Sequence, residues 1–286
     1  MRNPATSLAK LSQSLTAKAK SRSLDWSLLL FLALGLTVGW AEIAQAEKPE
    51  TAPPQLKDLL AQIDAAATRR DIKGVVQFYS DNFNNSDGLT RAAMERALTK
   101  LWERYPQVNY RTELKDWKAE GNGIVAETVT TITGTQASDA TKTTMESRLR
   151  SRQRIENQKI VQQNILAERT QLVSGEKPPD VEINLPEQVR VGQDFNFDVI
   201  VKEPLGGQLL LGTAVEEPVK PERYASPAKY KLELLPAGGI FKVGKAPLKP
   251  TDHWVSAVLI RGDGMTMITQ RLQFVDRLSA TTTPSK

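Results

Sequence analysis

The chain has 286 residues, 40% of them hydrophobic and 25% charged, a composition typical of globular proteins and a length sufficient for two ordinary domains. The formal net charge is +5, but residues 1–46 hold five basic and two acidic residues, so the rest of the chain, with 33 basic and 31 acidic residues, is nearly neutral. This balance argues against general nucleic-acid binding, and the lack of cysteine excludes disulfides, thiolate metal sites and cysteine nucleophiles.

Residues 1–46 have the order of an export signal. A basic, acid-free stretch to Leu24 precedes an apolar run at residues 27–40, and the small-residue motif Ala44-Gln45-Ala46 follows. The apolar run, about 14 residues, is shorter than the roughly 20 that span a bilayer. We therefore expect a signal peptide cleaved between Ala46 and Glu47, and export to the periplasm, the thylakoid lumen or the medium. An uncleaved membrane anchor and an organelle transit peptide are the alternatives.

Residues 47–53 are polar and are interpreted as a linker. Three helical patterns follow and end at Pro106, which cannot donate the next helical hydrogen bond. Each pattern places apolar residues on one helix face, in the sets Leu56, Leu59, Leu60 and Ile63; Ile72, Val75, Val76, Tyr79 and Phe83; Met94, Ala97, Leu98, Leu101, Trp102 and Tyr105. The polar stretch 81–88 lacks the ligand spacing of a calcium loop and is interpreted as a connection between helices.

After Pro106 the apolar period changes to two, which predicts β-strands. Four long strands are expected at residues 108–117, 124–135, 143–156 and 160–173. Three amphipathic helices need an apolar surface to cover, and this sheet is the nearest one. Residues 54–175 are therefore predicted to form an α+β domain of three helices and a curved antiparallel sheet.

This pattern resembles the nuclear-transport-factor-2-like (SnoaL-like) superfamily, a cone-shaped α+β fold. The resemblance rests on the segment Val75-Val76-Gln77-Phe78-Tyr79-Ser80-Asp81-Asn82-Phe83, the aromatic helix end at residues 102–105 and the strand order. It implies a pocket between the helices and the sheet. The candidate lining residues are Tyr79, Phe83, Trp102, Tyr110 and Trp117; the alternative is that these aromatic side chains fill the cone as core.

Catalytic members of such folds commonly place a histidine or aspartate in the cone as general base, with a tyrosine or second acid stabilising the oxyanion. The predicted domain has no histidine, and Asp81 and Tyr79, two apart on a helix, would point to different sides. Asp116 is no better placed. We therefore expect no catalytic residues, and regard an isomerase, dehydratase or cyclase acting on a small hydrophobic substrate as the alternative. A buried carboxylate and tyrosine converging in the cone would favour the enzyme.

Four arginines alternate with other residues in one predicted strand, at Arg148, Arg150, Arg152 and Arg154. Alternation in a strand places all four on one face. Two interpretations stay open: a solvated face paired with Glu113, Glu127 and Glu168 on neighbouring strands, or a surface for an anion or protein partner.

Pro178-Pro179 marks a joint, after which residues 178–276 hold about seven short strand patterns separated by Gly and Pro turns. This part resembles the immunoglobulin-like β-sandwiches of exported bacterial proteins in architecture, without their cysteine pair. Residues 277–286 are interpreted as a disordered tail. His253 is the only histidine, so it has no second histidine with which to form a metal site.

The sequence as a whole predicts an exported bacterial protein, in the cyanobacterial case a lumenal one, with an α+β domain followed by an all-β sandwich. We expect a non-catalytic binding or scaffolding protein without metal or cofactor. The expected partners are a small hydrophobic ligand or another protein, including a second copy of the chain; nucleic acid is not expected, and membrane contact would occur only through an uncleaved leader.

Overall fold

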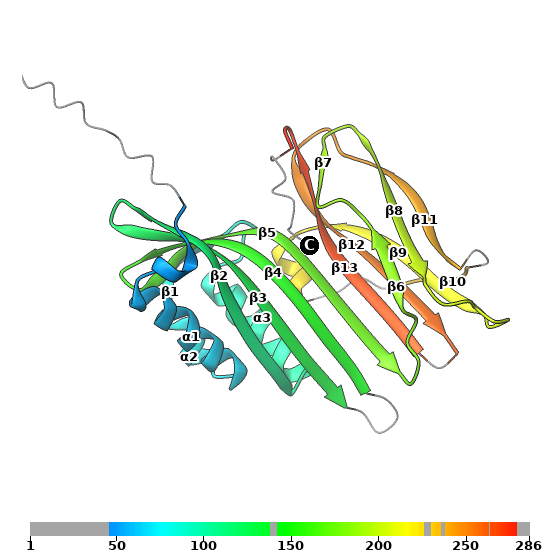
Figure 1. The fold of residues 1–286 in the computed structure, drawn as a ribbon, viewed down its shortest axis with the longest axis horizontal. Helices are drawn as coiled ribbons and strands as arrows, with labels where there is room; N and C mark the ends of the chain where they lie inside the picture. Colours follow the sequence, from blue (N-terminus) through cyan, green and yellow to red (C-terminus); the bar gives the residue numbers. More distant parts are fainter. Residues whose placement is uncertain (1–45, 138–141, 226–229, 236–237, 263, 279–286) are drawn as a thin grey trace, which may run out of the picture. The chain divides into compact units, whose positions relative to one another are not determined.

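The computed structural model describes residues 46–137, 142–225, 230–235, 238–262 and 264–278 (Figure 1). The expected signal sequence up to residue 45 and the tail from residue 279 lie outside the described residues. Within these ranges, none of the helices has the length and apolar character needed to cross a membrane.

The helices lie in the first part of the described chain. They are α1 (Pro54–Thr68), α2 (Ile72–Val76) and α3 (Arg91–Arg104), with short 3-10 turns η1 (Pro49–Thr51) and η2 (Pro221–Ala225). The carboxylate of Asp71 caps α2 by accepting the N–H of Gly74 at 2.9 Å, and Thr90 caps α3 in the same way. Such side chains satisfy backbone donors that have no partner within the helix.

The second predicted helix is wrong beyond Val76. Residues Tyr79–Asn85 form strand β1, which pairs in parallel with β5 (Lys159–Gly175). Tyr79 and Phe83 are both buried, because residues four apart share a face in a strand as well as in a helix. The apolar spacing therefore fitted both structures, and the run of Ser, Asp and Asn between them favours the non-helical one.

A ten-stranded sheet runs through the described chain. Its order is β10-β9-β12-β13-β5-β4-β3-β2, with β1 also on β5 and β7 on β13. The strands other than β1 and β5 are β2 (Gln107–Glu120), β3 (Gly123–Ala137), β4 (Lys142–Glu156), β7 (Gln188–Arg190), β9 (Leu210–Pro218), β10 (Glu233–Leu234), β12 (Thr251–Arg261) and β13 (Gly264–Val275). The four long antiparallel strands that the sequence predicted are present as β2 to β5.

Strand β5 joins the two halves of the sheet. Its first residues pair with β1, and its last residues pair antiparallel with β13, from Arg169↔Gln270 to Gly175↔Gly264. Because backbone hydrogen bonds cross from β5 to β13, the sheet continues past the predicted joint at Pro178 and Pro179 (Figure 1).

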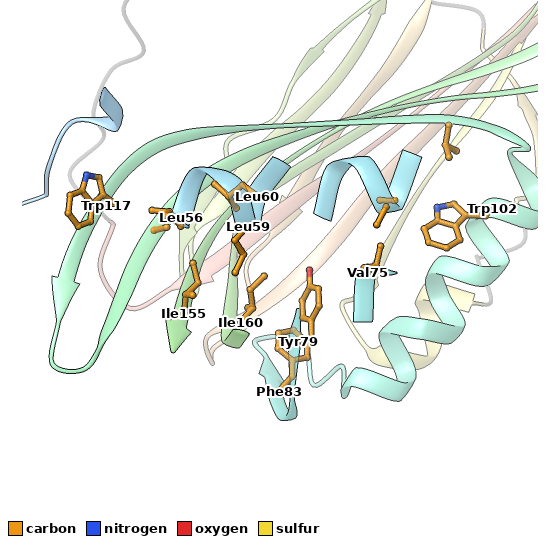
Figure 2. Packing of buried hydrophobic residues seen from close by; sticks show 14 of the residues in the cluster. Leu56, Leu59, Leu60, Val75, Tyr79, Phe83, Trp102, Trp117, Ile155 and Ile160 are labelled. Carbon is orange, nitrogen blue, oxygen red and sulfur yellow. The ribbon is translucent and has the colours of Figure 1, made fainter. Parts of the chain in front are cut away.

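The two halves bury opposite faces of this sheet. The helices cover one face of β2 to β5, around a core that includes Leu56, Trp102 and Ile160 (Figure 2). A second sheet of β6 (Val181–Asn184), β8 (Asp194–Val201) and β11 (Gly239–Lys245), in the order β11-β8-β6, shares another core with β9, β12 and β13. Leu272 and Phe274 of β13 belong to that second core, whereas Arg271, which directly precedes Leu272 in the strand, points to the opposite face.

Candidate functional site

A cavity of about 360 Å³ lies between the helices and the sheet. Residues of α1, α3, β1 and β2 to β5 line it, and more than half of the lining residues are apolar, among them Leu60, Leu98, Leu101 and Ile132. A cavity of this size lies within the range of small-molecule sites, which are usually apolar with a few polar groups.

The five aromatic residues proposed from the sequence take different places. Tyr79 and Tyr110 line the cavity. Trp102 donates its Nε1–H to the Tyr110 hydroxyl at 3.1 Å, and Phe83 packs edge-on against Tyr79 with ring centroids 4.9 Å apart. Trp117 lies away from Tyr79 (Figure 2) and donates to the Lys48 carbonyl and the Thr51 hydroxyl. Phe83, Trp102 and Trp117 are buried core residues outside the cavity wall.

Asp64 on α1 also lines the cavity, and Thr112 on β2 fixes its carboxylate. Oδ2 accepts the backbone N–H of Thr112 at 2.5 Å, and Oδ1 accepts the Thr112 hydroxyl at 2.7 Å. The Thr112 hydroxyl lies 3.0 Å from that of Thr130. These bonds hold the carboxylate in one orientation against the sheet. Its position four residues after Leu60, on the apolar face of α1, is the signal in the sequence from which it could have been found.

Burial raises the pKa of Tyr79 and that of Tyr110 to about 12. For Tyr79, the proximity of Tyr110 and of the Asp64 carboxylate adds to the effect of burial. For Tyr110, the hydrogen bond from Trp102 opposes it. Both hydroxyls therefore keep their protons at neutral pH and can act as hydrogen-bond donors towards the cavity.

The stability of the protein should fall in alkali as these tyrosines ionise. An unfolded chain loses tyrosine protons near pH 10, whereas folded Tyr79 and Tyr110 keep theirs until about pH 12. Their contribution is complete below pH 10, and each tyrosine lowers the unfolding free energy by roughly 1.4 kcal/mol per pH unit from there until its folded pKa is reached. In a pH titration, the absorbance of tyrosinate should rise at higher pH in the folded protein than in the denatured protein. The same titration curve for both states would contradict these pKa shifts.

A cluster of buried charges, here called the seam cluster, lies where β13 meets β5. Arg271 of β13 has a fully buried side chain and forms two hydrogen bonds with Asp87, at 2.6 and 3.0 Å. It also pairs with Glu168 of β5 at 3.2 Å and with Asp252 of β12 at 2.8 Å. Tyr224 of η2 donates to Asp87 at 2.5 Å and completes the cluster.

The seam cluster favours the charged form of its arginine and the neutral form of its tyrosine. Burial opposes the charge on Arg271, but the hydrogen bond to Asp87 and the charges of Glu168 and Asp87 outweigh it and raise the pKa. For Tyr224, burial first and then the same two carboxylates raise the pKa. One cation thus faces three carboxylates.

The seam cluster is also part of the cavity wall. Glu168 and Tyr224 both line the cavity, and Trp254 of β12 donates to Glu168 at 2.9 Å while its ring packs edge-on against Tyr224. Tyr224, Trp254 and Arg271 come from the part of the chain after the predicted joint. The second half of the chain therefore contributes Tyr224 to the cavity wall, and Trp254 and Arg271 contact that tyrosine and Glu168.

The arginine stripe on β4 (Arg148, Arg150, Arg152 and Arg154) lies on the sheet face away from the helices. Glu127 pairs with Arg150 at 3.9 Å and with Arg152 at 3.2 Å, as the paired interpretation expects. Arg154 pairs with Glu120 and Glu156, and Arg150 also with Glu187. Arg148 lies opposite Arg169 of β5, and neither has an ion pair within the described ranges.

The expected pairing of the arginine stripe with Glu168 is wrong. Glu168 lies opposite Leu149, which faces the cavity, so the carboxylate points to the helix side of the sheet. Glu113 instead pairs with Arg111 and Lys115. Asp81, set aside as a catalytic base, is 84% exposed and pairs with Arg91.

Two protein-family models match the chain. Residues 60–163 match the SnoaL-like domain, and residues 176–275 match a domain of unknown function, DUF8623. Residues 60–163 are SnoaL-like. This fold includes both pocket enzymes and binding proteins, and the cavity lies between its helices and its sheet.

Several solved structures are similar to part of the chain at low identity. They include a cystatin-fold protein from Novosphingobium aromaticivorans (15% identity, 40% of this chain, 98% of that chain, TM-score 0.28), an LEH-like epoxide hydrolase from M. tuberculosis (10%, 39%, 80%, 0.28) and an NTF2-like protein from Cytophaga hutchinsonii (13%, 41%, 91%, 0.25). Bd1075 of Bdellovibrio bacteriovorus (14%, TM-score 0.28) is matched over 38% of either chain. No curated protein sequence matches the chain significantly.

The sequence analysis missed Asp64 and the seam cluster. Asp87 was placed in a polar connection, and Arg271 within a strand pattern. The described residues contain no group of histidine, aspartate and glutamate side chains arranged to hold a metal ion.

Proposed function

We propose that the protein is an exported, non-catalytic binding protein whose SnoaL-like part holds a small, largely apolar ligand. The observation that carries this proposal is the cavity of about 360 Å³ between α1, α3 and the sheet. Its apolar wall offers favourable burial for an apolar ligand, at roughly 25 cal/mol per Å². The polar groups Asp64, Tyr79 and Tyr110 would fix the orientation of that ligand.

The finer architecture belongs to the same proposal. The SnoaL-like part would be the cone of three helices and a curved sheet, and the DUF8623 part an immunoglobulin-like β-sandwich. Support for the sandwich comes from the shared core of β6, β8 and β11 with β9, β12 and β13. The proposal of export rests on residues 1–46, in which a basic segment, an apolar segment and a small-residue motif follow one another. The chain would be cleaved before Glu47 and delivered to the periplasm, the thylakoid lumen or the medium.

Native mass spectrometry of the protein purified gently from its own host tests binding and export together. We expect a chain mass of residues 47–286 plus a small molecule that is lost on denaturation, because a ligand held by burial alone leaves an unfolded chain. The bare mass of the chain in repeated preparations would contradict ligand binding. A chain that retains residues 1–46 would contradict cleavage and leave the ligand result unaffected.

One observation favours a second function, a pocket enzyme of the isomerase, dehydratase or cyclase type. Asp64, Tyr79 and Tyr110 line one cavity, so a carboxylate base and protonated tyrosines would face the same ligand. Incubating the host-derived ligand with the wild type and with Asp64→Asn separates the two functions. A ligand that is chemically changed by the wild type but not by Asp64→Asn supports the enzyme function. A ligand that is recovered unchanged from the wild type supports the binding function.

A protein or anionic partner on the arginine stripe is a further part of the binding proposal. Arg148 and Arg169 are arginines of this face that have no ion pair among the described residues, and guanidinium groups suit carboxylate and phosphate. A second copy of the chain is one such partner.

A further inference from the structure

The charged side chains of the cavity wall are all acidic. Asp64 and Glu168 line the cavity together with three tyrosines, and none of its lining residues in the described ranges is Lys, Arg or His. Behind Glu168, Arg271 is shared with Asp87 and Asp252, so one cation serves three carboxylates. Beside a largely apolar wall, such fixed charges act more strongly than in bulk water because they are screened less.

Asp64 is the carboxylate of the wall that has no counter-ion among the described residues. Glu168 is paired with Arg271, whereas both oxygens of Asp64 accept hydrogen bonds from Thr112 alone within the part of the chain that the structure describes. Each carboxylate oxygen has two lone pairs, so Asp64 can accept further donors from the cavity side. A cation stabilises a partly buried carboxylate more than a neutral donor does, because the opposite charge offsets the hydration that the carboxylate has lost.

Two further features of the wall suit a cationic donor. Tyr79 lies close enough to Tyr110 and to the Asp64 carboxylate for both to raise its pKa, and aromatic rings attract ammonium groups over their faces. Gln153, another lining residue, has a buried side-chain oxygen Oε1 with no hydrogen-bond partner in the described part of the chain. Asp64 and Gln153 thus give the cavity wall two side chains that can accept hydrogen bonds from a ligand.

We propose that the cavity selects apolar amines, with the protonated amine against Asp64, Tyr79 and Tyr110 and the apolar remainder against Leu98, Leu101 and Ile132. This inference rests on the proposed function, that the cavity binds a small apolar ligand, and adds the chemical class of that ligand.

Three probes of nearly equal shape test the class: n-octylamine, 1-octanol and octanoate, titrated calorimetrically into residues 47–286 at pH 7. The amine is protonated at this pH, the alcohol neutral and the carboxylate anionic. We expect the amine to bind at least about tenfold more tightly than the alcohol, as a hydrogen bond to a charged group predicts, and octanoate to bind most weakly. Equal binding of amine and alcohol would overturn the amine inference and leave the ligand-binding function intact. Failure of all three to bind would overturn both.

Asp64→Asn locates the selectivity. Asparagine keeps the shape and can still accept a hydrogen bond from Thr112, so we expect amine binding to fall to the level of the alcohol and alcohol binding to stay. The matched control is Asp58→Asn, which removes the same charge from an exposed position on α1 and should leave all three affinities unchanged. Undiminished amine preference in Asp64→Asn would overturn the assignment. If Asp64→Asn does not fold, the wild-type comparison of amine with alcohol still decides.

Discussion

Replacing Arg271 with alanine should lower the free energy of unfolding by about 3–5 kcal/mol, the range for breaking a buried ion pair by removing one partner. Arg271 is fully buried and pairs with Asp87, Glu168 and Asp252. Its loss leaves three carboxylates near one another without a cation, so burial and mutual repulsion both act against the folded state. Chemical denaturation followed by circular dichroism measures the change.

The control for this substitution is Arg150→Ala. Arg150 lies in the arginine stripe, is 44% exposed and pairs with Glu127 and Glu187. Exposed ion pairs contribute between zero and about 1 kcal/mol, so this variant should unfold almost like the wild type. Equal effects of the two substitutions would mean that the seam cluster contributes little to holding the halves together.

Phe274→Ala is expected to destabilise the protein by about 3–5 kcal/mol, because it removes a large side chain from a close-packed core. Phe274 is 1% exposed and packs against the rings of Phe195 and His253. Since β13 is hydrogen-bonded to β5, the SnoaL-like part should lose stability together with the second core. We therefore expect both halves to unfold in a single transition, at a lower denaturant concentration than in the wild type.

Tryptophan fluorescence can separate the halves in this experiment. Trp102 and Trp117 lie in the SnoaL-like part, so a Trp254→Phe background limits the signal of residues 47–286 to that part. Phe241→Ala is the control, because Phe241 is 53% exposed on β11 and its loss should change stability by no more than about 0.5 kcal/mol. An unchanged fluorescence midpoint in Phe274→Ala would show that the halves unfold independently.

Local patterns in the sequence predicted much of the fold. The alternation in residues 108–173 identified β2 to β5, because each strand buries one face against the helices. Asp71 and Thr90, residue types that favour helix N-caps, lie at the starts of α2 and α3. The prediction of a helix through Phe83 was wrong because apolar residues spaced four apart share a face in a helix and in a strand alike.

Long-range pairing is what the sequence did not predict. The contact of β5 with β13 joins residues about a hundred positions apart, and neither strand carries a pattern that names its partner. The seam cluster depends on this contact, so Arg271 and Asp87 could not be recognised beforehand as partners. Glu168 was assigned to the wrong face because the arginine stripe suggested a pairing that the register of β4 and β5 excludes.

A crystal structure of residues 47–286, grown with whichever of the three probes binds most tightly, tests the ligand-binding account most directly. The account predicts the probe between α1, α3 and the sheet, with its polar end beside Asp64, Tyr79 and Tyr110. A probe bound elsewhere on the protein while this cavity stays empty would contradict it.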